Sequence, residues 1–183
     1  ATDNALLRVL SVTTSGNVAL SVHDSALSGE NLEVIPAGPN GAEAGTTLLG
    51  TAILSGKVTG EEITLSAGDN VLLPAGTSIT GSNSVTIQGD AHAKDTIQGD
   101  AQAKDPDQNT GTTITVLGDV QAPSVTLAGG GDIDFFELLS ADGINPGGTT
   151  VIRGGAAADN FFLQGTAQTP DSLTTIRGEA GAD

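Results

Sequence analysis

Three segments in the last third of the chain carry glycine and aspartate at matching positions. They read LAGGGDIDFFEL from Leu127, IRGGAAADNFFL from Ile152 and IRGEAGAD from Ile176. Aligned on these apolar residues, one column holds Gly129, Gly154 and Gly178, and another holds Asp134, Asp159 and Asp183. Calcium takes about six to eight oxygen ligands from carboxylates and backbone carbonyls. The spacing therefore predicts calcium sites at these turns, with Asp132 as a further ligand.

The chemistry of such a column depends on how the segments stack. In neighbouring strands, about 4.8 Å apart, aspartates of one column repel each other unless a cation lies between them. Glycines permit positive φ, which lets a turn point its carbonyl oxygens inward. The alternative is that each aspartate caps its turn by hydrogen bonding to nearby backbone, as aspartate commonly does. The sequence leaves both alternatives open.

The three segments resemble the glycine- and aspartate-rich nonapeptide of RTX-type calcium-binding proteins, G-G-x-G-x-D-x-U-x with U apolar. The resemblance covers residues 125–183 and departs from the pattern at Asp132 and Ala157, which stand where the third glycine belongs. It implies calcium ions that are shared between consecutive turns. The repeat here is 24–25 residues long, so we expect one such turn in each larger coil.

Short strands must position these turns. A threonine lies between two apolar residues in four segments, 63–65, 85–87, 114–116 and 125–127, and related forms follow at 150–152 and 174–176. Their starting points are 22, 29, 11, 25 and 24 residues apart. Strands this short are stable when the next coil stacks on them, as in a parallel β-helix or β-roll. We therefore predict an all-β fold in which residues 46–183 form a parallel β-helix or β-roll-like solenoid.

The N-terminal residues 1–45 are expected to form a separate β segment. ALLRVLSVTT and VALSV flank Ser15-Gly16-Asn17, which predicts a β-hairpin, and residues 31–35 are a third strand. A stretch rich in proline, glycine and alanine at 36–45 marks a boundary. Residues 86–105 contain one ten-residue unit twice, with His92 replaced by Gln102. This duplication either lengthens one coil or forms two short turns beside the stack.

Composition excludes several functions. The chain has 22 acidic and 6 basic residues and a net charge of −16, which argues against binding to nucleic acid or anionic membranes. Without cysteine it has no disulfide or zinc–thiolate site. No apolar run approaches the roughly 20 residues of a membrane span, so no membrane insertion is expected. Neither a nucleophile motif nor a phosphate loop occurs, and we expect no enzymatic activity.

These features favour an extracellular or cell-surface structural or adhesive repeat protein, stabilised by Ca²⁺, that serves as a filament or surface-matrix subunit. The apolar segment ALLRVLSV near the N-terminus could add as a strand to a neighbouring molecule and build a fibre. The alternative is a β-helix lyase or hydrolase of acidic polysaccharides, for which Arg153 and Arg177 share one column. A third reading, compatible with the first, is a secretion module that folds on binding calcium.

Overall fold

The computed structural model describes residues 6–22, 30–35, 56–90, 111–139, 148–164 and 173–180. None of these residues is helical, and every ladder between their strands is parallel. The prediction of an all-β chain is confirmed in this part of the chain. No described segment is a helix long and apolar enough to cross a membrane.

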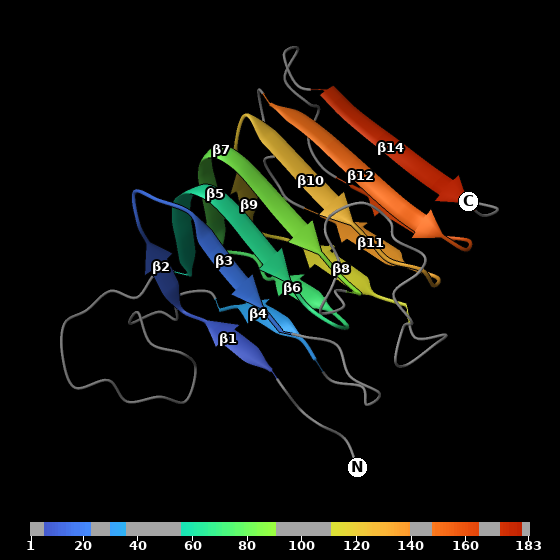
Figure 1. The fold of residues 1–183 in the computed structure, drawn as a ribbon, viewed down its shortest axis with the longest axis horizontal. Helices are drawn as coiled ribbons and strands as arrows, with labels where there is room; N and C mark the ends of the chain where they lie inside the picture. Colours follow the sequence, from blue (N-terminus) through green and yellow to red (C-terminus); the bar gives the residue numbers. More distant parts are fainter. Residues whose placement is uncertain are drawn as a thin grey trace.

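The strands form two sheets (Figure 1). Sheet A has the order β1 (Leu7–Val9), β4 (Leu32–Val34), β6 (Val71–Leu73), β8 (Thr113–Val116), β11 (Phe135–Leu138) and β13 (Asn160–Leu163). Sheet B contains β2 (Ser11–Thr13), β3 (Val18–Ser21), β5 (Lys57–Ser66), β7 (Ser78–Gln88), β9 (Asp119–Gln121), β10 (Ser124–Ala128), β12 (Thr149–Ala156) and β14 (Leu173–Ala180).

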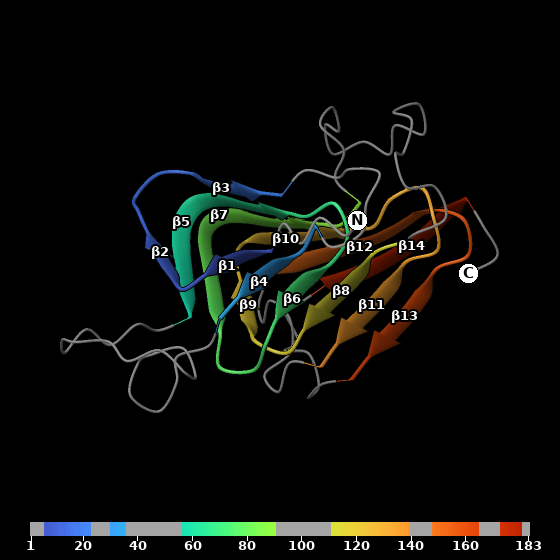
Figure 2. The same ribbon diagram turned by 90° about the horizontal axis from the view of Figure 1, so that it is seen from below.

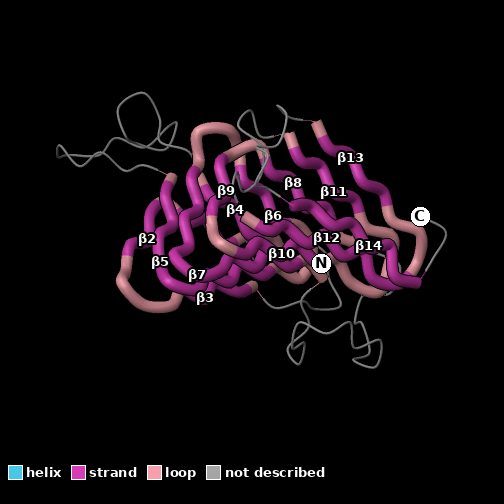
Figure 3. The backbone as a smooth tube through the Cα atoms, turned by 90° about the horizontal axis from the view of Figure 1, so that it is seen from above, coloured by secondary structure: helices cyan, strands magenta, loops and turns pink. Residues whose placement is uncertain are grey.

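The chain alternates between the two sheets and moves one position along both at each visit. We call one strand of sheet A, together with the sheet B strands that follow it, a layer. The described residues form six layers, from β1–β3 to β13–β14. Figure 2 shows that β5 and β7 bend, so that one half of β7 pairs with β9 and the other with β10. Figure 3 shows the layers following one another in sequence order.

The register explains the uneven spacing of the short segments. Five of the six lie in one column of sheet B, where Ile63, Val85, Val125, Thr150 and Thr174 are successive partners. The sixth, which begins at Ile114, lies in sheet A between Val71 and Phe136. Within sheet B the spacing is thus 22, 40, 25 and 24 residues. The interval of 40 residues between Val85 and Val125 is still much longer than the others.

That interval contains the duplicated unit. A later connection from sheet B to sheet A runs from Leu127 in β10 to Phe136 in β11, and these two residues are nine positions apart in the sequence. The equivalent residues Ile87 and Ile114 are 27 apart. The first five residues of the duplication, Thr86–Asp90, complete β7 and the turn after it, and the rest of it lies outside the described residues. The extra length therefore falls in a single connection between two layers, from β7 to β8.

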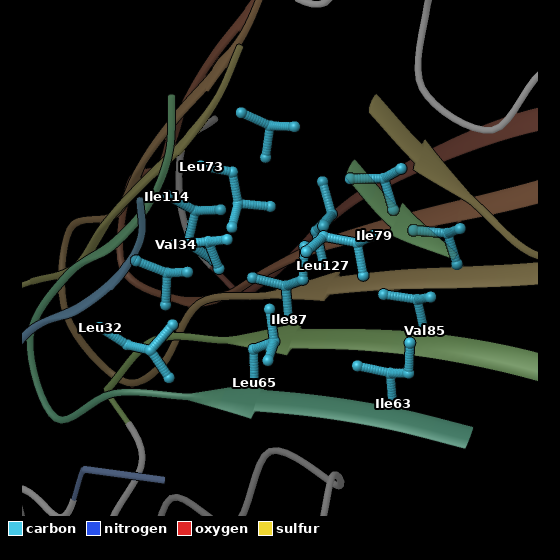
Figure 4. Packing of buried hydrophobic residues seen from close by; sticks show 14 of the residues in the cluster. Leu32, Val34, Ile63, Leu65, Leu73, Ile79, Val85, Ile87, Ile114 and Leu127 are labelled. Carbon is cyan, nitrogen blue, oxygen red and sulfur yellow. The ribbon is translucent and has the colours of Figure 1, made fainter. Parts of the chain in front are cut away.

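The core lies between the sheets. Alternate residues point inward from each strand, because side chains of a strand alternate between its two faces. Figure 4 shows side chains of the two sheets facing one another, with Leu32, Val34, Leu73 and Ile114 from sheet A and Leu65, Ile87 and Leu127 from sheet B. All of these are fully buried. The core is thus a set of apolar columns that run along the stack.

The predicted N-terminal hairpin is wrong. β2 and β3 flank the turn at Ser15-Gly16-Asn17, but both pair with β5 in parallel, and β1 pairs with β4. Stacking on the next layer buries Val9 and Val18, which an isolated two-stranded hairpin could not do. The boundary expected at 36–45 lies outside the described residues, and the strands before and after it belong to the same two sheets.

Candidate functional site: the buried carboxylate column

Layers 2 to 6 each begin with a polar residue at the corner where the chain enters sheet A. This residue stands two positions before the first inward residue of the sheet A strand, and the registers of sheet A align it between layers. From layer 2 to layer 6 its position is occupied by Glu30, Asp69, Thr112, Asp134 and Asp159. All five are buried. We call this set the carboxylate column.

The carboxylates of the column bind the backbone of the preceding layer. The Thr112 N–H donates to Oδ1 of Asp134 at 2.7 Å, and the Asp134 N–H donates to Oδ1 of Asp159 at 3.0 Å. The same relation joins the Glu30 N–H to Oδ2 of Asp69 at 2.9 Å. Oδ2 of Asp134 also accepts the N–H of Gly130, in its own turn, at 2.7 Å. The three bonds between layers satisfy buried backbone donors, which would otherwise cost free energy, and the bond from Gly130 is partly buried.

The glycine column makes room for these carboxylates. A Cβ at Gly129 would collide with the carboxylate of Asp134, and one at Gly154 with that of Asp159. Neither glycine has a positive φ. The expectation that these glycines serve a left-handed conformation is therefore wrong for these two. Gly178 falls in the same column, because Arg153 pairs with Arg177 and Gly155 with Glu179.

A third carboxylate approaches the same corner. Asp90 is buried, and its Oδ2 accepts the N–H of Gly131 at 2.8 Å. The pKa of the Asp134 carboxyl is raised to about 7. Burial is the largest cause, the negative charges of Asp159 and Asp90 act in the same direction, and the hydrogen bonds from Thr112 and Gly130 oppose the shift. The corner thus places carboxylates close together in a dry environment.

The surroundings of Asp134 fit capping rather than cation binding. Both oxygens of the Asp134 carboxylate already accept backbone N–H groups. A calcium ion beside this carboxylate would need oxygen ligands where these N–H groups now lie. Among the described residues, no three side chains of Asp, Glu, His or Cys are grouped so that they could hold a metal. Asp132 lies partly exposed in the turn before Asp134, and Asp183 lies outside the described residues. Calcium binding stays a prediction.

Sequence reasoning missed the first half of the column. Glu30, Asp69 and Thr112 were not among the predicted site residues. A signal was present, because acid–Asn–apolar–x–apolar occurs at 30–34, 69–73 and 159–163. The asparagines of the first two also stack: Nδ2 of Asn70 donates to Oδ1 of Asn31 at 2.8 Å, and the Thr113 N–H donates to Oδ1 of Asn70 at 2.9 Å.

Arg153, Arg177 and the four phenylalanines lie in the last two layers. Arg153 and Arg177 are register partners, as expected, and Nη1 of Arg153 lies 3.6 Å from Oε1 of Glu179. The rings of Phe136 and Phe161 stack inside with centroids 5.0 Å apart. The other two phenylalanines, Phe135 and Phe162, are exposed.

Comparison with known proteins adds no relative. No protein-family model, curated protein or solved structure gives a significant match to the chain.

Proposed function

We propose that the chain is a structural module, a parallel β-solenoid in which each layer is one coil, and that it serves as a stiff repeat segment of an extracellular or surface-matrix protein. The observation that carries the proposal is the unbroken parallel register from β1 to β13 and from β2 to β14. Each added layer extends the same core and the same ladders, which is how repeat proteins build length.

Several described groups that could perform chemistry are engaged in contacts within the chain. Asp134 and Asp159 accept backbone N–H groups, and Arg153 is paired with Glu179. A catalytic carboxylate needs free oxygens within reach of a substrate, and the buried carboxylate column does not offer them. The extracellular location is proposed from the acidic composition and the RTX-like segments.

Hydrogen exchange tests the structural proposal. A stack with one continuous core is expected to protect the amides of β5, β7, β10 and β12 with similar opening free energies. Protection confined to one half of the stack would contradict a single module. Cleavage of polyuronates, abolished by Arg153→Ala with protection unchanged, would replace the structural proposal with the lyase or hydrolase alternative.

Calcium stabilisation is a second part of the proposal, and it rests on the RTX-like segments rather than on the contacts of Asp134. Calcium is expected to protect amides in residues 125–180 and to leave those of β5 unchanged. Exchange is measured with calcium and with a chelator, and magnesium serves as the control ion. Equal protection of residues 125–180 in all three conditions removes calcium from the proposal and leaves the structural role intact.

A further inference from the structure

The sixth layer leaves part of the core uncovered. β13 and β14 are edge strands, each paired on one side only among the described residues. Leu163 and Ile176 are 44% and 46% exposed, whereas their register partners Leu138 and Ile152 are 4% and 0% exposed. The apolar columns therefore end at a surface that a further layer would bury. We call this surface, made of Phe161, Leu163 and Ile176, the end face.

The free backbone groups of the edge strands β13 and β14 determine which strands can pair with them. In a parallel ladder, each strand bonds one neighbour through one set of backbone groups and the next neighbour through the other set. The free groups of β13 and β14 therefore match those that β1 and β3 present at the opposite end of the stack. Exposed edges of this kind invite strand pairing and are normally covered.

We propose that the end face binds the first layer of a second copy of this chain, in the same direction and register, so that β13 pairs with β1 and β14 pairs with β3 of that copy. The inference rests on the proposed structural function. It adds an interface to that function and names the residues on both sides.

The sheet registers specify which residues meet. The column that runs through Leu32, Val71 and Phe136 ends at Phe161 and begins at Leu7. The column that contains Ile152 likewise ends at Ile176 and begins at Leu20. A parallel second copy would thus place its Leu7 on Phe161 and its Leu20 on Ile176. Leu7 and Leu20 are only partly buried in one copy, so both can bury further surface.

Two neighbouring columns also fit. Val9 would meet Leu163, although Val9 is already buried and adds less new contact. Outside the core, a single column begins at Arg8, runs through Glu33 and Glu137, and ends at Phe162. Arg8 would lie beside Phe162, whose side chain is 49% exposed. A guanidinium over an aromatic face within about 6 Å is attractive.

The proposed contact is heterologous, because one end of a copy binds the opposite end of the next. Heterologous contacts build a closed ring only if the rotation from one copy to the next brings the last copy back to the first. Otherwise they build open, linear fibres. Two copies with a net charge of −16 each repel one another. Salt screens this repulsion, so association is expected to increase with ionic strength.

Single cysteines can report the register, because the natural chain has none. Extending the ladder places Ser21 of the second copy beside Arg177. A mixture of Ser21→Cys and Arg177→Cys chains, oxidised at high salt, is expected to form covalent heterodimers. Homodimers of Arg177→Cys in excess would show that two end faces meet each other, and would overturn the proposed direction.

Complementation tests the interface. Ile176→Glu disables the end face and Leu7→Glu disables the first layer, so each variant alone is expected to associate at least tenfold more weakly. Their mixture retains one intact pair of surfaces and is expected to form a 1:1 dimer by sedimentation. Ile133→Glu, at a position 61% exposed and away from the end face, is the control and is expected to associate as the natural chain does.

Hydrogen exchange separates the failure of this inference from failure of the structural proposal. If the natural chain stays monomeric at high concentration and salt while all layers are protected, the second-copy interface is wrong and the module stands. If both variants are protected like the natural chain and still fail to complement each other, the interface is equally refuted. Loss of protection across half of the stack refutes the structural module itself.

Discussion

At the scale of single residues, the buried carboxylates bear most directly on stability. Asp134→Ala would leave the N–H groups of Thr112 and Gly130 without their acceptor. A buried donor without a partner costs about 1–3 kcal/mol, so the free energy of unfolding is expected to fall by roughly 2–5 kcal/mol. Urea unfolding measures this loss. Asp119→Ala, at an exposed position, is the control, and an equal loss there would contradict the capping role.

The pH dependence of stability follows from the raised pKa of Asp134. Its pKa is about 7 in the folded chain and about 3.9 when unfolded. The folded state therefore holds this proton more tightly. The stability that the proton contributes is fully present below about pH 4 and is lost as pH rises through about 7.

Unfolding measured from pH 4 to pH 8 tests this expectation. The other carboxyl groups also titrate, so the informative quantity is the difference between the natural chain and Asp134→Asn, which cannot titrate at this position. The natural chain is expected to lose more stability than the variant across this range. Parallel pH profiles of the two chains would show that Asp134 is charged in the folded state.

At the scale of elements, the turn between the sheets depends on the fit of a glycine against a carboxylate. Gly154→Ala would drive a Cβ into the carboxylate of Asp159. Overpacking of this kind costs about 1–3 kcal/mol, and the thermal midpoint is expected to fall by several degrees.

Gly131→Ala is the matched control for this substitution. A Cβ at Gly131 would meet no atom within 4 Å, and Gly131 has no positive φ. Its replacement is expected to be neutral or to stabilise by about 0.4–1 kcal/mol through the unfolded chain. A large loss at Gly131 would show that the turn needs glycine for another reason than space.

The same turn shows what sequence reasoning could find about the site. The columns of Gly129 and Asp134 were visible because glycine and aspartate recur at one spacing. The choice between a cation and a cap was not visible, because the donor that meets Asp134 belongs to Thr112, 22 residues earlier. Composition gives no information on which layer lies next to which.

At the scale of the whole molecule, the six layers tolerate extra length only where it leaves the register intact. Deleting residues 91–108 would bring Ile87 and Ile114 to the nine-residue spacing of Leu127 and Phe136. Closing a shorter loop loses less entropy, so the thermal midpoint is expected to stay within a few degrees or rise.

A longer deletion, 91–112, is the control for this experiment. It leaves Ile87 and Ile114 five residues apart. That is one residue fewer than the spacing of the equivalent residues Leu65 and Val71, the shortest such connection among the described layers, and a one-residue slip in a strand turns its apolar side chains to the wrong face. The midpoint of this variant is expected to fall clearly below that of the shorter deletion. Unfolding of both variants would show that the residues between β7 and β8 belong to the core.

The sequence by itself determined the local structure of this protein. Alternation of apolar and polar residues indicated short strands and the side chains that point inward from them. Only the tertiary structure decided that β2 and β3 pair with β5 instead of each other, and that Ile114 belongs to sheet A. Strand formation depends on neighbours in sequence, whereas pairing depends on burial shared with residues 21 or more positions away. The burial of Asp134 against Thr112 is a contact of this second kind.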